Sequence, residues 1–287
     1  MRILAFLLLL GWLVPGDALY EDLSAGPVTD ALAGAYVAYA AGIDAVYTNP
    51  AGLAQTSRFM AETFYKPLYG GLGIGLRTLQ ASIALPYHGT MVAFSYKETG
   101  ASLQTQGYES AYTGAYRESA WTFSMARFLT EGLALGMNLH LFRFQEPRFG
   151  GTSTFGLDLG LLGRVNTRWT LGASIQNFNR PSLHGTYRNE PLPVTIAVGL
   201  SYRPWSSATT VVEAQKTMDH PARLSFGQEI RFAQDRIALR LGLAQEGEVT
   251  TPTLGFGLTS GSLQLNYAAV FSLDLPLTHV FGLSYRR

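Results

Sequence analysis

Cysteine is absent from all 287 residues of the chain. Its absence excludes disulfides, thiolate metal sites and a lipid-modified N-terminal cysteine. The five histidines are scattered without metal-ligand spacing, and no serine lies in a G-x-S-x-G motif. We therefore expect no catalytic residue, no metal and no cofactor, and we predict that the protein is not an enzyme.

Charge is also scarce. Only 14% of the residues are charged and 47% are hydrophobic, whereas roughly 25% are charged in a typical soluble domain. This composition indicates that part of the protein surface does not face water. The net charge of +1 provides no basic footprint, so a nucleic-acid partner is not expected.

Long hydrophobic runs are missing as well. The run from Ile3 to Val14 follows Arg2 and precedes the small residues Gly16-Asp17-Ala18, a pattern typical of a signal peptide cleaved near Ala18. Beyond it no stretch approaches the length of a membrane-spanning helix. A charge-poor exported chain without such a helix can still cross a membrane as a closed β-barrel, in which all backbone groups are paired.

Apolar and small or polar residues alternate along most of the chain, as they do in barrel strands. From 133 to 142, Leu or Met occupies every odd position opposite residues such as Asn138 and His140. Such segments lie at 58–66, 74–85, 89–98, 116–127, 132–145, 153–165, 168–178, 192–203, 208–216, 222–232, 236–246, 251–259, 261–271 and 276–286. They predict an all-β transmembrane antiparallel barrel of about 14 strands. The long connections at 99–115, 146–152, 179–191 and 217–221 are expected on the outer surface.

Residues 34 to 54, GAYVAYAAGIDAVYTNPAGLA, depart from this alternation. Between 30 and 43 small residues fall on one helical face and larger apolar residues on the other, with no charge from Ala31 to Ile43. This pattern predicts an enclosed helix, followed by a rigid turn at Asn49-Pro50. We expect a signal peptide at 1–18, an N-terminal hatch at 19–57 and the barrel at 58–287.

This segment, followed by an all-β chain, resembles the PorV/PorQ family of outer-membrane barrels within the FadL-like superfamily. The resemblance extends to VVEAQ (211–215), RLSFGQEIRF (223–232), TPTLGFGL (251–258) and LPLTHVFGLSYRR (275–287). It implies a 14-stranded barrel with a small hatch inside the lumen. One departure is that the family's last strand usually ends in an aromatic residue, whereas this chain ends Tyr285-Arg286-Arg287. The barrel-insertion signal is therefore expected at Phe281, Leu283 and Tyr285.

Three functions are compatible with these observations. The PorV/PorQ resemblance implies a non-enzymatic partner in protein secretion or surface delivery of the type IX kind. The wider superfamily implies passage of hydrophobic small molecules, such as fatty acids or hydrocarbons, across the outer membrane. A soluble exported β-sandwich is disfavoured, because 14 two-faced strands would expose too much apolar surface to water. A hydrophobic tunnel to a lateral gap would favour transport, and a lumen filled by the hatch would favour partner binding.

Two groups of residues are candidates for function. The first is the hatch group Asp44, Asn49, Pro50, Ala51 and Gly52. The turn at Asn49, Pro50 and Gly52 either closes the barrel floor as a structural element or forms a gate, and Asp44 either caps a hatch backbone amide or contacts a ligand. The second comprises charges on the inward register: Asp158, Arg164, Glu213, Arg223, Glu229, Arg231 and Arg240. They either pair with one another and the hatch to fill the lumen or line a passage.

The expected location is the outer membrane of a Gram-negative-type bacterium. The expected partners are membrane lipid and a secretion-machine protein, secreted cargo or hydrophobic small molecules.

Overall fold

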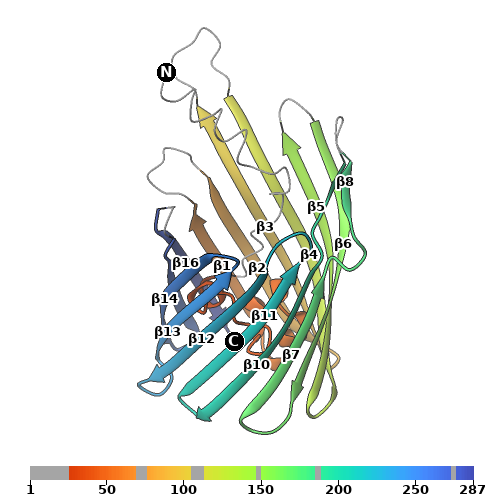
Figure 1. Ribbon diagram of the computed structural model, residues 1–287. Coiled ribbons are helices and arrows are strands. Elements are labelled where there is room, and N and C mark those ends of the chain that lie inside the picture. Colours follow the sequence, from red (N-terminus) through yellow and green to blue (C-terminus); the bar gives the residue numbers. More distant parts are fainter. Residues whose placement is uncertain (1–25, 69–75, 105–112, 147–149, 185–188, 273–275) are drawn as a thin grey trace.

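Fourteen strands form a closed antiparallel barrel in the computed structural model (Figure 1). The structure describes residues 26–68, 76–104, 113–146, 150–184, 189–272 and 276–287, so the predicted signal peptide lies outside the described residues. The barrel strands are β1 (Met60–Pro67), β2 (Arg77–Tyr87), β3 (Thr90–Gln104), β4 (Thr113–Thr130), β5 (Leu133–Glu146), β6 (Gly150–Arg164), β7 (Trp169–Gln176), β10 (Thr195–Trp205), β11 (Ala208–Thr217), β12 (Ala222–Phe232), β13 (Ile237–Glu246), β14 (Val249–Ser260), β15 (Leu263–Val270) and β16 (Thr278–Arg286). Each predicted strand segment corresponds to one of them. The predicted all-β barrel is therefore confirmed.

The alternation in the sequence becomes the two faces of the wall. On β5, Ala134, Asn138 and His140 are buried inside the barrel, at 0, 0 and 3% exposure. Leu135 and Leu139 on the same strand are 37% and 43% exposed on the outer face. An apolar outer face matches the hydrocarbon of a membrane, and the polar inner face can form hydrogen bonds within the lumen.

The two ends of the barrel differ (Figure 1). Short turns, including those around Gly132, Asn166 and Gly261, join the strands at one end, here called the turn end. The longer connections lie at the opposite loop end, which in outer-membrane barrels faces outward. The long loop predicted at 99–115 is partly wrong, because β3 and β4 stay paired as far as Gln104 and Thr113. The residues at these strand ends are mostly small or polar and show no apolar alternation, so nothing in the sequence indicated that they belong to strands. Their backbones nevertheless stay paired beyond the apolar part of the wall.

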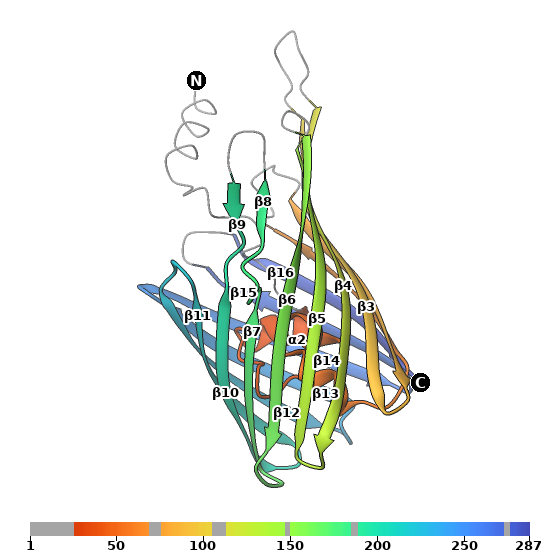
Figure 2. The same ribbon diagram turned by 90° about the vertical axis from the view of Figure 1, so that its right-hand side faces the viewer.

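A small hairpin of β8 (Ser182–His184) and β9 (Asn189–Pro191) occupies the predicted loop 179–191 and stands above β7 and β10 in Figure 2. Its Leu183 packs with Leu192 against Ala120 and Phe142 of the inner wall. Three-residue strands are too short for an alternation to be recognised in the sequence, so this hairpin was not predicted.

The hatch is less helical than the sequence predicts. It consists of α2 (Pro27–Ala31) and the 3-10 helices η1 (Gly42–Tyr47) and η2 (Pro50–Gln55). The helix predicted over 30–43 is wrong. Ala33 and Gly34 have φ values of 54° and 86°, which end the right-handed helix there. In the described part of the chain no helix is long and apolar enough to cross a membrane.

The hatch lies inside the barrel (Figure 2) and supplies a large part of its apolar core. Ile43, Val46 and Leu53 pack against luminal Ala84 and Ala93 on β2 and β3. Elsewhere the hatch backbone approaches strand glycines directly. A Cβ on Gly136 would lie 2.2 Å from the Ala51 nitrogen, so only glycine allows β5 to approach η2 this closely.

Candidate functional site

The hatch and the luminal side chains that bind it form the candidate site. Its buried backbone groups must be satisfied within the barrel, because the hatch has little regular structure of its own. Glu213 on β11 accepts hydrogen bonds from the backbone nitrogens of Tyr36 and Val37, at 2.8 and 2.7 Å. These N–H groups therefore bind the wall instead of continuing a helix.

Side chains around the wall bind other hatch carbonyls. The Asn138 amide on β5 donates to the Val46 carbonyl at 2.6 Å, and the Gln176 amide on β7 donates to the Tyr47 carbonyl at 2.7 Å. Further donors are the Thr253 hydroxyl to Ala31 at 2.9 Å and the Arg223 guanidinium to Ala33 at 3.2 Å. The hatch is thus anchored to well-separated parts of the barrel.

The predicted turn at Asn49 to Gly52 begins η2. The Asn49 side chain accepts from the Ala51 nitrogen at 3.2 Å and donates to the carbonyls of Val37 and Leu161, both at 2.8 Å. Pro50 occupies the first turn of η2, where the missing N–H costs nothing. A Cβ on Gly52 would lie 2.6 Å from the Ala40 backbone. Each residue has a structural task in this geometry, and a gating role for the turn stays a prediction.

Asp44, the remaining hatch candidate, lies in η1 and is 5% exposed. It faces Glu62 on β1, whose carboxylate accepts a hydrogen bond from the Ser284 hydroxyl at 2.7 Å. Burial is the main reason that the pKa of Asp44 is raised, and the interactions with Glu62 and the Arg286 and Arg240 guanidinium groups lower it in part. The sequence suggested a cap for a hatch amide, whereas the structure places this carboxyl against another carboxyl.

All seven predicted luminal charges face the lumen, and each is bonded to another luminal group or to the hatch. Glu229 is the centre of one cluster. It accepts from Arg231 and Arg240, both at 2.7 Å, and from the Tyr39 hydroxyl. Arg164 bonds to Gln55 at 3.4 Å. The charges nevertheless form several separate clusters and not one continuous site.

Asp158 belongs to a second cluster, which lies on β5 and β6. It accepts from Asn138 at 2.9 Å, from the backbone nitrogen of Asn177 at 2.9 Å and lies 2.5 Å from the Nε2 atom of His140. The His140 ring stacks on Tyr47 of the hatch, with centroids 6.3 Å apart. This cluster therefore joins β5, β6 and the hatch.

Sequence reasoning missed several of these anchors. Asn138, Gln176 and Thr253 were not candidates, although they occupy inward positions on their strands. Their signal was a hydrogen-bonding side chain on the luminal register. That signal identifies a buried polar group but not the hatch carbonyl it binds. In the described residues no group of three or more potential ligands could hold a metal ion.

Two polar chambers lie on either side of the hatch. The loop-end chamber has a volume of about 430 Å³ and is lined by residues such as Lys66, Glu213 and Arg223. The turn-end chamber has a volume of about 620 Å³ and lies next to Tyr39 and Asp44 of the hatch. The hatch with its anchors occupies the space between them.

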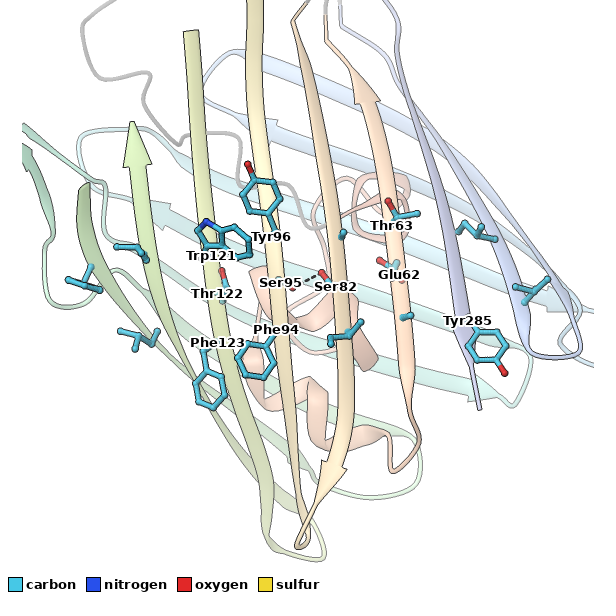
Figure 3. Close-up of a pocket in the computed structure, with 18 residues that line it drawn as sticks. Glu62, Thr63, Ser82, Phe94, Ser95, Tyr96, Trp121, Thr122, Phe123 and Tyr285 are labelled. Atoms are coloured by element: carbon cyan, nitrogen blue, oxygen red, sulfur yellow. Dashed lines mark hydrogen bonds between the residues drawn. The ribbon is translucent and has the colours of Figure 1, made fainter. Parts of the chain in front are cut away.

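An apolar groove of about 670 Å³ lies on the wall formed by β1 to β6, β15 and β16 (Figure 3). Phe94 and Phe123 stand together at one level, and Tyr96 and Trp121 stand together at another. Between them the groove reaches Ser82, Ser95 and Thr122, and it also reaches Glu62. These four residues are buried on the luminal register. Inward and outward residues alternate in a strand, and β1 to β4 are paired without a gap beneath the groove, so the groove is a depression in the outer face of the wall with the strand backbone as its floor.

The predicted barrel-insertion residues lie on the last strand, β16. Phe281 and Leu283 are 49% and 43% exposed on the outer face. The Tyr285 ring packs edge-on against Phe59 at 6.4 Å. Their role in insertion stays a prediction.

No protein-family model matches the chain, and no curated protein matches it by sequence. Solved structures do match. The toluene transporter TbuX of Ralstonia pickettii has a TM-score of 0.69 at 14% identity, covering 92% of this chain and 99% of that one. The Pseudomonas putida toluene transporter TodX has a TM-score of 0.66 at 12% identity, covering 91% and 97%. A Pseudomonas aeruginosa FadL homologue has a TM-score of 0.63 at 11% identity, covering 90% and 97%.

At these identities the likeness concerns the fold. The chain has a FadL-like outer-membrane barrel fold of 14 strands with short helical pieces at its N-terminal side. The matched proteins are named as toluene transporters and a FadL homologue. The fold that the resemblance implies, a barrel of 14 strands with a hatch inside it, is therefore confirmed.

Proposed function

We propose that this protein resides in the outer membrane of a Gram-negative-type bacterium and passes hydrophobic small molecules across it. The observation that carries the proposal is the apolar groove on the outer face of the wall. A groove lined by Phe94, Trp121 and Phe123 suits hydrocarbon or aromatic molecules. The names of the structural neighbours, which are toluene transporters and a FadL homologue, agree with this class of molecule.

The luminal side of the same wall supports the proposal. There the apolar residues Ile43, Val46 and Leu53 of the hatch pack against the small luminal side chains of Ala84 and Ala93. If the hatch moved, it would uncover an apolar surface directly inside the groove. Because β1 to β4 are paired along the groove, passage through the wall would also require two of these strands to separate; a hydrophobic molecule would then avoid the polar chambers.

The experiment is uptake of radiolabelled toluene and oleate by cells that express the chain in place of their own transporters of this type. Ala81→Trp fills the floor of the groove, because Ala81 lines it from an outward position. Ala214→Trp is the matched control, since Ala214 is an exposed outward alanine on β11, outside the groove. Uptake should fall about tenfold or more in the first variant and stay unchanged in the control. Equal uptake in both variants would count against a route through the groove.

A second candidate function is that of a PorV/PorQ-type partner in protein secretion or surface delivery. The observation that favours it is the firm attachment of the hatch by Glu213, Asn138 and Gln176, with polar chambers on both sides. A filled, polar lumen suits a barrel that presents a surface to other proteins.

Affinity purification from native membranes in mild detergent separates the two candidates. Secretion-machine proteins or secreted cargo that co-purify in stoichiometric amounts would favour the partner role. Bound fatty acids or hydrocarbons without a protein would favour passage.

A further inference from the structure

Charge is distributed unevenly between the two ends of the lumen, although the chain carries a net charge of only +1. The loop-end chamber is lined by two cationic residues, Lys66 and Arg223, and by three acidic ones, Asp30, Glu213 and Glu246. The turn-end chamber is lined by three carboxylates, Asp44, Glu229 and Asp235. It is also lined by the arginines Arg164, Arg168, Arg203, Arg231, Arg240 and Arg286. Its lining therefore carries six cationic residues against three acidic ones.

The strand register shows that this arrangement is built into the wall. Arg203 follows the buried luminal Ser201 at a spacing of two on β10, and Arg286 follows the buried luminal Ser284 on β16. Arg168 comes from the turn between β6 and β7. Side chains from three separate parts of the barrel thus line one chamber.

The described carboxylates of the chamber form no ion pair with Arg168, Arg203 or Arg286, although Asp44 interacts with Arg286 at longer range. Glu229 is 2% exposed and is already occupied by Arg231 and Arg240 at 2.7 Å each. Among the described residues, Arg168, Arg203 and Arg286 have no carboxylate within ion-pair distance. Unneutralised cations in a concave site focus the potential and raise the local concentration of anions.

We propose that the turn-end chamber is a binding site for small organic anions that carry carboxylate or phosphate groups, with Arg168 and Arg203 on one side of the chamber and Arg286 on the other. The guanidinium group suits these ligands because its planar set of donors matches the oxygens of both groups. A chamber of about 620 Å³ accommodates a small molecule. The ligand would lie directly against the Tyr36–Ala41 segment of the hatch, which lines the same chamber.

The site faces the periplasm if the short turns do so, as in other outer-membrane barrels. A free anion is favoured over the headgroup of a membrane lipid, because Arg203 and Arg286 lie on the luminal register and not on the lipid-facing one. The inference goes beyond the proposed function, because the anion would bind in the turn-end chamber whether or not hydrophobic molecules cross the wall.

The test is isothermal titration of the purified full chain, in neutral detergent at low salt, with citrate and with inorganic phosphate. Both should bind saturably, and added salt should weaken binding because it screens charges over about 10 Å at 0.1 M. Changing Arg168, Arg203 and Arg286 together to Gln should weaken citrate binding about tenfold or more. Changing the same three residues to Lys should restore part of the affinity.

The matched control changes Arg77, Arg143 and Arg180 to Gln. These arginines lie toward the loop end, and no ion pair is present for them in the described part of the chain. The control removes the same amount of charge and should leave citrate binding unchanged. Heat-dependent gel mobility checks that every variant is a folded barrel, and single Arg→Gln changes replace any triple variant that does not fold.

Three outcomes would overturn the proposal. The first is no saturable binding of citrate or phosphate at low salt. The second is equal weakening by both triple variants, which would indicate a general charge effect. The third is binding only of phosphatidylglycerol nanodiscs or of poly-glutamate, which would assign the arginines to lipid headgroups or to an acidic protein. None of these results depends on the uptake of toluene or oleate, so the proposed function is judged separately.

Discussion

Glu213 is the anchor whose removal should affect the hatch most. Its carboxylate is 5% exposed and is the acceptor for the N–H groups of Tyr36 and Val37, at 2.8 and 2.7 Å. Glu213→Ala removes both bonds and leaves two backbone donors in the lumen without that partner. We expect the hatch to leave its seat more often, while the barrel stays folded.

The size of the effect follows from the bonds that are lost. A hydrogen bond to a charged group contributes about 1.5–3 kcal/mol. Two such bonds correspond to about 3–6 kcal/mol, and neighbouring bonds are not fully additive. At the lower limit of about 3 kcal/mol, the population of the released hatch should rise roughly 100-fold.

Thiol labelling can measure this population, because the chain contains no cysteine. Ala35→Cys places a single thiol in the hatch at a position that is 0% exposed. With a water-soluble maleimide, the labelling rate reports the fraction of molecules in which the hatch is released. The rate should rise roughly 100-fold when Glu213→Ala is added.

Glu246→Ala is the control for this measurement. Glu246 lies at the loop end and forms only a long, partly exposed contact with Arg223 at 3.8 Å. Such a pair contributes no more than about 1 kcal/mol, so labelling should change less than about fivefold. An unchanged rate in Glu213→Ala would refute the view that this carboxylate holds the hatch. Loss of the folded barrel in that variant would instead show that hatch and wall unfold as one unit.

Three further perturbations test other contacts. Gly160→Ala would place a Cβ 2.1 Å from the Asn49 Oδ1 atom and should lower the midpoint of thermal unfolding by at least about 4 °C. In the control Gly163→Ala the nearest atom to the new Cβ lies at 3.9 Å, so the midpoint should not fall. Equal midpoints in the two variants would contradict the close packing of Gly160 against the hatch. Arg240→Met leaves the buried Glu229 with one cation and should cost about 3–5 kcal/mol in denaturant unfolding, so a loss below about 1 kcal/mol would contradict the importance of that pair. Burial raises the pKa of Tyr47 to about 12. The unfolded state loses this proton first, near pH 10, so the contribution of Tyr47 to the free energy of unfolding is intact below about pH 10 and falls by up to about 2.7 kcal/mol towards pH 12. The difference in tyrosinate absorbance between the protein and its Tyr47→Phe variant, titrated with base, measures this pKa. Ionisation of Tyr47 near pH 10 would contradict its burial.

The strand pattern could be read without the structure, whereas the hatch could not. The alternation at 133 to 142 is a local property, and it correctly predicted which face of β5 points outward. The uncharged stretch from Ala31 to Ile43 was also correctly expected to be enclosed. Its predicted helix was wrong because the competing partner, Glu213, lies 176 residues from Val37 in the sequence. No periodicity within the stretch could reveal such a partner.

The candidate site shows the same division. Asp158 and Glu229 were recognisable as inward charges, since their strand neighbours alternate. Their partners were not recognisable, because His140 and Arg240 come from neighbouring strands whose register depends on pairing along the whole ladder. The wall groove was also invisible in the sequence, since it depends on how side chains from several strands meet.

The amino-acid order by itself determined the number of barrel strands, the face that each of them turns to lipid and the presence of a separate N-terminal segment. These features depend on residues within about ten positions of one another. Only the tertiary structure decided the backbone path of the hatch, the pairing of the luminal charges and the accumulation of arginine at the turn end. A closed barrel brings residues from distant strands around one lumen, so that the partner of each buried polar group is set by the closed wall and not by its neighbours in the chain.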